Sequence, residues 1–218
     1  MVAMHNYASN EEWYWSWYLE ELRQTGFISH IEYQPKPFKI CDPVKISYNV
    51  QMKRKGTVQK EIPILQGSEY TADWAWWWTD KAKEIFFTTD PFKNPKDFPF
   101  FVNTKGSSYF SVVDVKGTFD PNNNVRMFAM NQKMIYKLYG IYVQAIVPRP
   151  TVKVVGESDP PSLIIKPKTA LFYKTFTPQR YLRTDASGKP RKILYPVKPI
   201  TQFVDEQRNK LEAVSGQV

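Results

Sequence analysis

The residues best suited to chemistry stand in the run Val112-Val113-Asp114-Val115-Lys116-Gly117. Alternate side chains of a β-strand share a face, so Asp114 and Lys116 lie together while Val113 and Val115 point the other way. A carboxylate beside an ammonium group can hold a divalent cation next to a phosphate. The run therefore predicts metal-assisted chemistry on a phosphate ester. The alternative is a surface lysine that simply pairs with an acid.

A second carboxylate, Asp73, interrupts the strongly aromatic stretch Glu69–Trp78. If this stretch forms one strand, Asp73 points away from the face that carries Tyr70 and Trp74. A carboxylate among aromatic rings loses hydration and needs a partner, and a metal ion can be that partner. An ordinary exposed strand position is the alternative.

The composition is that of a globular protein. The chain has 218 residues, of which 42% are hydrophobic and 16% aromatic, enough for one core or for one core with an appendage. No stretch approaches the ~20 apolar residues that span a bilayer, and Met1–Asn10 does not resemble a signal peptide. Cys41 is the single cysteine, so no internal disulfide can form. We therefore expect a soluble cytoplasmic protein that is not secreted and has no membrane partner.

The positive charge is concentrated toward the end of the chain. The net charge is +9, of which residues 151–218 carry +6. This segment is also rich in proline, which argues against long regular elements. We divide the chain into a domain at residues 1–150 and a basic C-terminal extension at residues 151–218. An extension that binds a polyanion and a tail that docks on its own domain are both open.

Hydrophobic periodicity and turn residues give the order of elements, which is that of an α/β protein with a mixed sheet and helices on its faces. The expected helices cover Asn10–Thr25, Asn124–Tyr139 and Thr201–Val214. The expected strands cover Phe27–Tyr33, Phe38–Ile40, Val44–Lys53, Thr57–Leu65, Glu69–Trp78, Tyr109–Val115 and Ile141–Val147.

The first helix carries a third acidic candidate. Ser9 and Glu12 have the spacing of a capping box, and Gly26 ends the helix. Glu11 is a rival, because helical spacing aligns it with Trp15 on the apolar stripe and so directs it to the core. Glu12 lies at the margin of that stripe.

Four segments, taken together, resemble the PD-(D/E)xK nuclease superfamily, and in particular its phage branch similar to Holliday-junction resolvases. They are Ser9–Glu12, Gly26–Pro35, Tyr70–Asp73 and Val113–Gly117, and the resemblance covers residues 9–147. This chain has Asp where the commoner form of the motif has Glu. Both are hard oxygen ligands, so the departure does not put activity in doubt.

The resemblance implies a restriction-endonuclease-like mixed sheet and assigns roles to individual residues. It places Mg²⁺ or Mn²⁺ on Glu12, Asp73 and Asp114, with Lys116 assisting attack on the phosphate. It adds Glu32, from the strand after the first helix, to the catalytic group. It also implies a homodimer, since enzymes of this type cut two strands symmetrically.

Several residues are candidates for contact with DNA. Three cations of the second long helix fall on nearly one face, and a solvated amphipathic helix is the alternative. A further cluster lies in the extension, and a polar residue follows Tyr33. These candidates are Gln34, Arg126, Lys133, Lys137, Lys189, Arg191 and Lys192.

The sequence thus predicts a metal-dependent endonuclease that cuts DNA, branched or at a Holliday junction, in a phage setting and hence in the host cytoplasm. Neither a G-x-x-x-x-G-K-S/T nor a G-x-G-x-x-G loop is present, so no nucleotide cofactor is expected. The alternative is a catalytically silent DNA-binding or virion-associated structural protein that keeps the nuclease fold.

Overall fold

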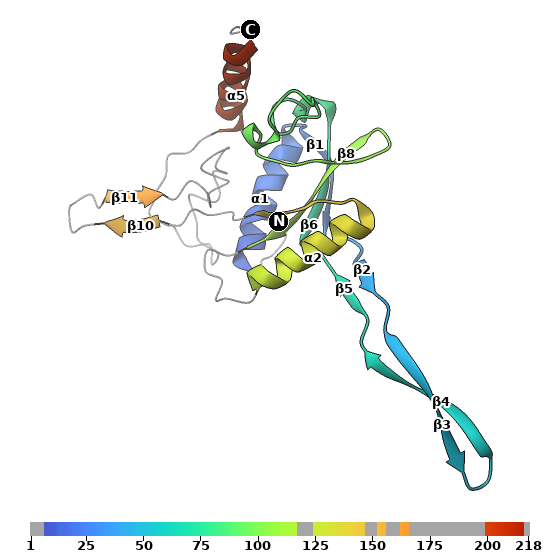
Figure 1. Ribbon diagram of the computed structural model, residues 1–218. Helices are drawn as coiled ribbons and strands as arrows, with labels where there is room; N and C mark the ends of the chain where they lie inside the picture. The colour runs from blue at the N-terminus through green and yellow to red at the C-terminus, as the bar shows by residue number, and fades with distance from the viewer. Residues whose placement is uncertain (1–6, 117–123, 147–151, 156–161, 166–198, 216–218) are drawn as a thin grey trace.

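The computed structural model describes residues 7–116, 124–146, 152–155, 162–165 and 199–215 (Figure 1). The helices are α1 (Asn10–Gln24), α2 (Asn124–Tyr139) and α5 (Ile200–Ser215), with 3-10 turns η2 (Asp80–Ala82) and η3 (Pro95–Asp97). The strands are β1 (Ile28–Tyr33), β2 (Phe38–Cys41), β3 (Val44–Met52), β4 (Gly56–Leu65), β5 (Ser68–Tyr70), β6 (Trp74–Trp78), β7 (Asn103–Lys105), β8 (Ser108–Val115), β9 (Val143–Ile146), β10 (Val152–Val155) and β11 (Ser162–Ile165).

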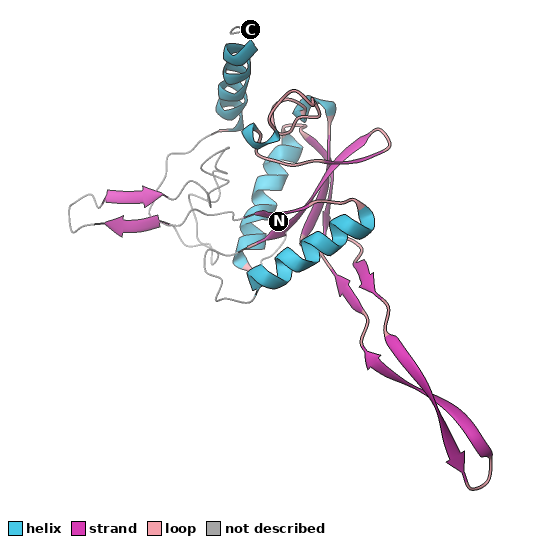
Figure 2. Cartoon of the chain, viewed as in Figure 1, coloured by secondary structure: helices cyan, strands magenta, loops and turns pink. Residues whose placement is uncertain are grey.

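A five-stranded mixed sheet forms the centre of the molecule (Figure 2). Its order is β1-β6-β8-β7, and β9 also pairs with β8. The neighbouring strands are antiparallel except β9, which runs parallel to β8 after the α2 crossover. The predicted α/β class, a mixed sheet flanked by helices, is confirmed at this level.

Helix α1 begins and ends where the sequence predicted. The Ser9 hydroxyl accepts a hydrogen bond from the Glu12 backbone N–H at 3.2 Å and satisfies an otherwise unpaired donor of the first turn. Gly26 takes a φ of 77°, a left-handed conformation that glycine adopts at little cost, and the chain turns there into β1. The helix buries Trp15 and Leu19 completely against one face of the sheet.

Helix α2 covers the opposite face of the sheet. Its buried side chains Phe128 and Ile135 are seven residues apart and pack in a second core with Val112 and Val143. This separation of two cores explains why β8 is buried on both faces. It also explains the near-continuous apolar sequence of β8, which is typical of a central strand.

The segment Glu69–Trp78, predicted to be one strand, is two. Strand β5 pairs with β2 in a separate two-stranded sheet, whereas β6 joins the central sheet. The residues between them let the chain change partners, and Tyr70 and Trp74 consequently lie in different cores, Tyr70 on the α2 side and Trp74 on the α1 side. The expectation that these two rings share a face was therefore wrong.

The described end of the C-terminal extension packs on the body of the protein. The Phe203 ring of α5 lies 5.2 Å from the Phe86 ring, and Ile200 and Val204 are buried in the same core as α1. In addition, Gln207 Nε2 donates to the Asp97 carbonyl at 3.3 Å. Helix α5 thus behaves as a docked element of the domain. Within the described ranges, no helix is both long and apolar enough to cross a bilayer.

Candidate active site

Two carboxylates meet where β6 begins and β8 ends. The strands are antiparallel, with Trp74 opposite Val113, so Asp73 and Asp114 lie at the same edge of the sheet. The Asp73 backbone N–H donates to the Val113 carbonyl at 3.1 Å, and Asp73 Oδ2 accepts from the Val115 N–H at 2.6 Å. Both hydrogen bonds direct the Asp73 side chain toward the Asp-x-Lys motif.

The carboxyl groups of Asp73 and Asp114 are in hydrogen-bonding contact. Burial, followed by the negative charge of Asp114, raises the pKa of Asp73 to about 7. The hydrogen bond from the Val115 N–H opposes this rise, and the charge of Glu12 adds to it. Two like charges this close are unfavourable unless a proton or a cation lies between them. The pair is therefore suited to holding a cation.

Lys116 lies beside Asp114, as the alternation of the strand predicted. Its Nζ lies 2.6 Å from Asp114 Oδ1 and 5.2 Å from the centre of the Phe128 ring of α2. Its side chain is 28% exposed and that of Asp114 9%, so the ion pair is shielded from bulk water on the Asp114 side. One amine thus stands beside the acid pair and still reaches solvent.

Tyr70 is a residue of the site that the sequence interpretation missed. Its hydroxyl donates to Asp114 Oδ2 at 2.5 Å, while Lys116 contacts the other oxygen of the same carboxylate. Burial, then the negative charge of Asp114, raises the pKa of Tyr70, so its hydroxyl stays a donor. Its position three residues before Asp73 could have indicated a role at the site. The alternation of side chains along a strand, however, predicts only the face on which the ring lies and not the contacts of its hydroxyl.

The third acid, Glu12, reaches the same edge from the start of α1. It is only 6% exposed, and both of its oxygens accept hydrogen bonds, from the Ser9 hydroxyl at 2.8 Å and from the Tyr33 hydroxyl at 2.7 Å. Burial and the bond to Glu12 raise the pKa of Tyr33 to about 12. Glu12 also interacts electrostatically with Asp73.

Of the two adjacent acids, Glu12 is buried, whereas Glu11, which was expected to face the core, is half-buried. The reason is the capping box: Ser9 binds the side chain of the residue three positions later and draws it inward. Tyr33, which holds the other oxygen of Glu12, is a second site residue that the sequence interpretation missed.

The two remaining candidates from the first half of the chain are placed differently. Glu32 lies on β1, and its carboxylate contacts His30 Nε2 at 3.2 Å. In the part of the chain that the structure describes, no hydrogen bond joins Glu32 to the three acids. Gln34 is closer to them: its backbone N–H donates to the Asp73 carbonyl at 2.8 Å, and its exposed side chain amide donates to the Tyr33 hydroxyl at 3.3 Å.

The predicted basic residues are described only in part. Lys133 and Lys137 are exposed on α2, four residues apart. Arg126 belongs to the first turn of the same helix, but its side chain is not among those described. Lys189, Arg191 and Lys192 lie outside the described residues.

The acidic side chains at this site form a small donor set for a metal ion. Among the described residues, no group of three or more His, Cys, Asp or Glu side chains is placed to hold a metal. Two acids in contact are present, however, and Mg²⁺ is commonly held by one or two carboxylates together with water and substrate phosphate oxygens. Asp73 and Asp114 therefore fit Mg²⁺, with Glu12 behind them and held in place by Ser9 and Tyr33.

The chain matches no protein-family model, and no curated protein or solved structure is significantly similar to it.

Proposed function

We propose that this protein is a metal-dependent endonuclease that hydrolyses phosphodiester bonds in DNA. One observation carries the proposal: Asp73 and Asp114 are in contact at one edge of the sheet, and Lys116 Nζ lies 2.6 Å from Asp114. Asp114 lies on β8 of the mixed sheet, and Asp73 is the residue before β6, the antiparallel neighbour of β8. This arrangement supports a restriction-endonuclease-like core.

Asp73 and Asp114 would hold Mg²⁺ or Mn²⁺, which when bound supplies positive charge at the phosphate and lowers the pKa of a coordinated water. Asp114 is oriented for this role because Tyr70 and Lys116 each bind one of its oxygens. Asp73 is oriented by the Val115 N–H, which donates to its Oδ2, and its carboxyl group contacts that of Asp114.

Lys116 would bind the scissile phosphate and stabilise the negative charge that develops on it during attack. Its amine lies beside Asp114, and its side chain is partly open to solvent. Glu12 is fixed by two hydroxyl groups and contributes negative potential at Asp73. We propose that it receives a proton or orients a water behind the pair. Glu32, whose carboxylate contacts His30, has no described contact with these acids and plays no part in this proposed mechanism.

DNA would lie across this edge of the sheet. Lys133 and Lys137 are exposed on α2, the helix that packs Phe128 against Lys116, so they extend the positive charge away from the site. Contacts from such cations to phosphates provide affinity without sequence preference. Gln34, whose backbone N–H donates to the Asp73 carbonyl, would contact the backbone of the DNA.

The decisive experiment compares cleavage of a four-way junction, a flap and a linear duplex in Mg²⁺ and in EDTA. We expect Mg²⁺-dependent cutting by the full chain and none by the Asp114→Asn variant. Asp80→Asn is the matched control, because Asp80 is an exposed acid at the other end of β6 and should not affect cutting. Cutting that survives EDTA would contradict the proposal. Salt-sensitive binding without cutting would favour a silent DNA-binding or structural protein instead.

A further inference from the structure

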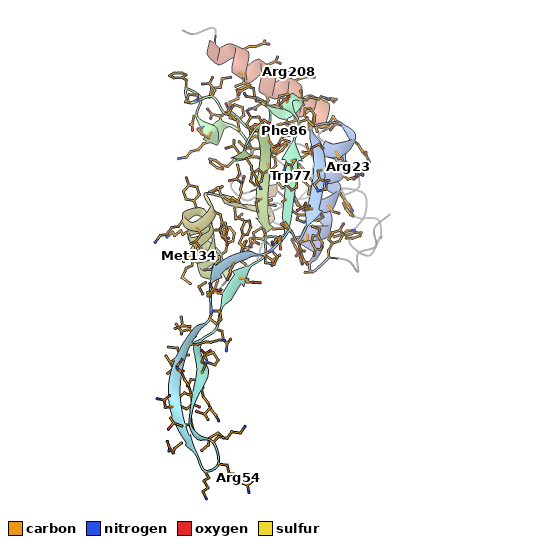
Figure 3. All side chains as sticks on the ribbon, turned by 90° about the vertical axis from the view of Figure 1, so that its right-hand side faces the viewer. Arg23, Arg54, Trp77, Phe86, Met134 and Arg208 are labelled. Atoms are coloured by element: carbon orange, nitrogen blue, oxygen red, sulfur yellow. The ribbon has the colours of Figure 1, made fainter. Side chains whose placement is uncertain are left out.

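Strands β3 and β4 form a two-stranded ribbon that extends far from the body of the protein (Figures 1 and 3). Arg54 marks its tip in Figure 3. The ribbon pairs only with itself, as a separate two-stranded sheet, and β2 and β5 form its base. At about 3.3 Å per residue, nine-residue β3 extends it by about 30 Å. Nearly every residue of the ribbon is exposed.

The two faces of the ribbon differ sharply in chemistry. Residues directly opposite each other in antiparallel strands share a face, so the register sorts the side chains. One face carries the pairs Ile46–Ile62, Tyr48–Lys60, Val50–Val58 and Met52–Gly56, and the other carries Lys45–Pro63, Ser47–Glu61, Asn49–Gln59 and Gln51–Thr57. We call the first the apolar ribbon face. Lys60 is its one charged side chain.

This apolar face is exposed to solvent in the single chain. Ile46 is 46% exposed, Tyr48 42% and Ile62 42%. A two-stranded hairpin is marginally stable in water unless its apolar side is covered. A contiguous exposed apolar face on an otherwise solvated ribbon marks an interaction surface.

We propose that the apolar ribbon face packs against the same face of a second copy of this chain, with the two ribbons antiparallel about a twofold axis. The contact is isologous, which means that the same surface of each copy forms both sides of the interface. Ile46 of one copy would therefore lie against the apolar ribbon face of the other. The resemblance noted above implies a dimer but assigns it no surface. This proposal is independent of the nuclease activity and goes beyond it.

Charge favours the antiparallel over the parallel orientation of two copies. The tip holds three consecutive cations, Lys53, Arg54 and Lys55, whereas the base holds two exposed acids, Asp42 and Glu69, and one cation, Lys39, which pairs with Asp42. Antiparallel packing brings the basic tip of each copy to the acidic base of the other, whereas parallel packing brings tip against tip.

Nucleic acid suits the apolar ribbon face poorly. The face itself offers one cation, Lys60, to a row of phosphates. A partner that covers apolar side chains is the better match.

The first test measures the mass of the full chain by sedimentation equilibrium without DNA or metal. We expect a dimer of the 25.6 kDa chain, and we expect Ile46→Lys with Ile62→Lys to convert it to a monomer. The matched control, Asn49→Lys with Gln59→Lys, adds the same charge to a cross-strand pair on the polar face and should leave the dimer intact. The near-UV spectrum of the tryptophan-rich core reports whether each variant stays folded.

A monomeric wild type at tens of micromolar concentration would overturn the proposal, as would a dimer that survives the apolar double variant. A chain that is monomeric alone and binds DNA through this face would make nucleic acid the occupant, and would overturn it equally. None of these outcomes depends on cleavage, so failure here and failure of the nuclease proposal are distinguishable.

The second test determines orientation with the single native cysteine. Cys41 is exposed at the base of the ribbon, and Arg54→Cys adds a thiol at the tip. With a short bismaleimide, antiparallel ribbons should give cross-links between position 41 of one copy and position 54 of the other. Cross-links only between two tips would refute the antiparallel arrangement. The Ile46→Lys, Ile62→Lys background should abolish cross-linking between copies.

Discussion

Asp73 Oδ2 accepts a hydrogen bond from the backbone N–H of Val115 at 2.6 Å, which ties the residue before β6 to the residue between Asp114 and Lys116. Because Val115 belongs to a buried central strand, this bond fixes the side chain of Asp73 on a rigid support. The backbone of residues 114–116 therefore carries two side chains of the site, Asp114 and Lys116, and also positions a third, that of Asp73. An active site needs this rigidity if its groups are to be placed before substrate arrives.

The first prediction concerns stability without metal. Replacing Asp73 by Asn should stabilise the metal-free protein at pH 8 by about 1–3 kcal/mol, a range reduced because Asp73 is only partly buried. The substitution removes a charge that burial and Asp114 disfavour and keeps an oxygen for the Val115 N–H. Thermal melts in EDTA measure the effect.

The sign follows from proton binding. Between the ordinary carboxyl pKa of 3.8 and about 7, the folded protein retains a proton on Asp73 that the unfolded chain has released, so stability falls as pH rises through this window. The gain from Asp73→Asn should therefore vanish near pH 4. A variant that melts lower than wild type at pH 8 in EDTA would contradict the raised pKa.

The second prediction concerns the pH dependence of metal binding. Binding to the acid pair requires Asp73 to lose its proton, so below pH 7 the affinity for Mg²⁺ should fall by about tenfold per pH unit. Titration calorimetry in two buffers of different ionisation enthalpy counts the proton released. Affinity that is constant from pH 5.5 to 7.5 would exclude Asp73 as a ligand with this pKa.

The third prediction separates binding from chemistry at Lys116. Lys116→Ala should lower the cleavage rate by ~10²–10⁴-fold while junction binding in Ca²⁺ changes little. Lys116→Arg keeps the charge beside Asp114 and should recover part of the rate. If the alanine variant cuts at the wild-type rate, the lysine is only a structural partner of Asp114.

The fourth prediction concerns the tyrosine that holds Asp114. Tyr70→Phe keeps the buried ring but removes the donor to Oδ2, and should cost ~1–3 kcal/mol in the free energy of unfolding. Urea denaturation in EDTA measures this loss. Tyr136→Phe on α2 is the matched control, because Tyr136 is 60% exposed and should show almost no change. Equal effects of the two substitutions would contradict a special role for Tyr70.

The fifth prediction distinguishes the two adjacent acids of α1. Glu12→Gln should strongly reduce Mg²⁺-dependent cutting, whereas Glu11→Gln should leave it near the wild-type rate. Glu12 is buried and interacts with Asp73, and Glu11 is half-buried at the neighbouring position. Parallel cleavage assays decide between them, and loss of cutting in the Glu11 variant alone would reverse the assignment.

Local rules predicted most of the elements that carry the site. The Ser9–Glu12 spacing gave the start of α1, and the alternation in Val113–Lys116 put Asp114 and Lys116 on one face, where they form an ion pair. These features depend on residues within four positions of one another, so the sequence alone contains the information.

Long-range pairing accounts for what the sequence did not predict. The break between β5 and β6 arises because the two strands pair with different sheets, and no residue within Glu69–Trp78 signals a change of partner. The hydroxyl contacts of Tyr70 and Tyr33 with the acids likewise join residues 44 and 21 positions apart. Hydrophobic periodicity counts both tyrosines as aromatic residues and does not predict the hydrogen bonds of their hydroxyl groups.

The base of the ribbon and the acid pair share one short piece of backbone. Strand β5 ends at Tyr70, whose hydroxyl holds Asp114, and Asp73 follows three residues later. The ribbon is thus an arm about 30 Å long, and its base lies next to the carboxylates in the chain. Because the backbone from Tyr70 to Asp73 joins the ribbon to the carboxylates, a change in the position of the ribbon would also act on the hydrogen bond between Tyr70 and Asp114.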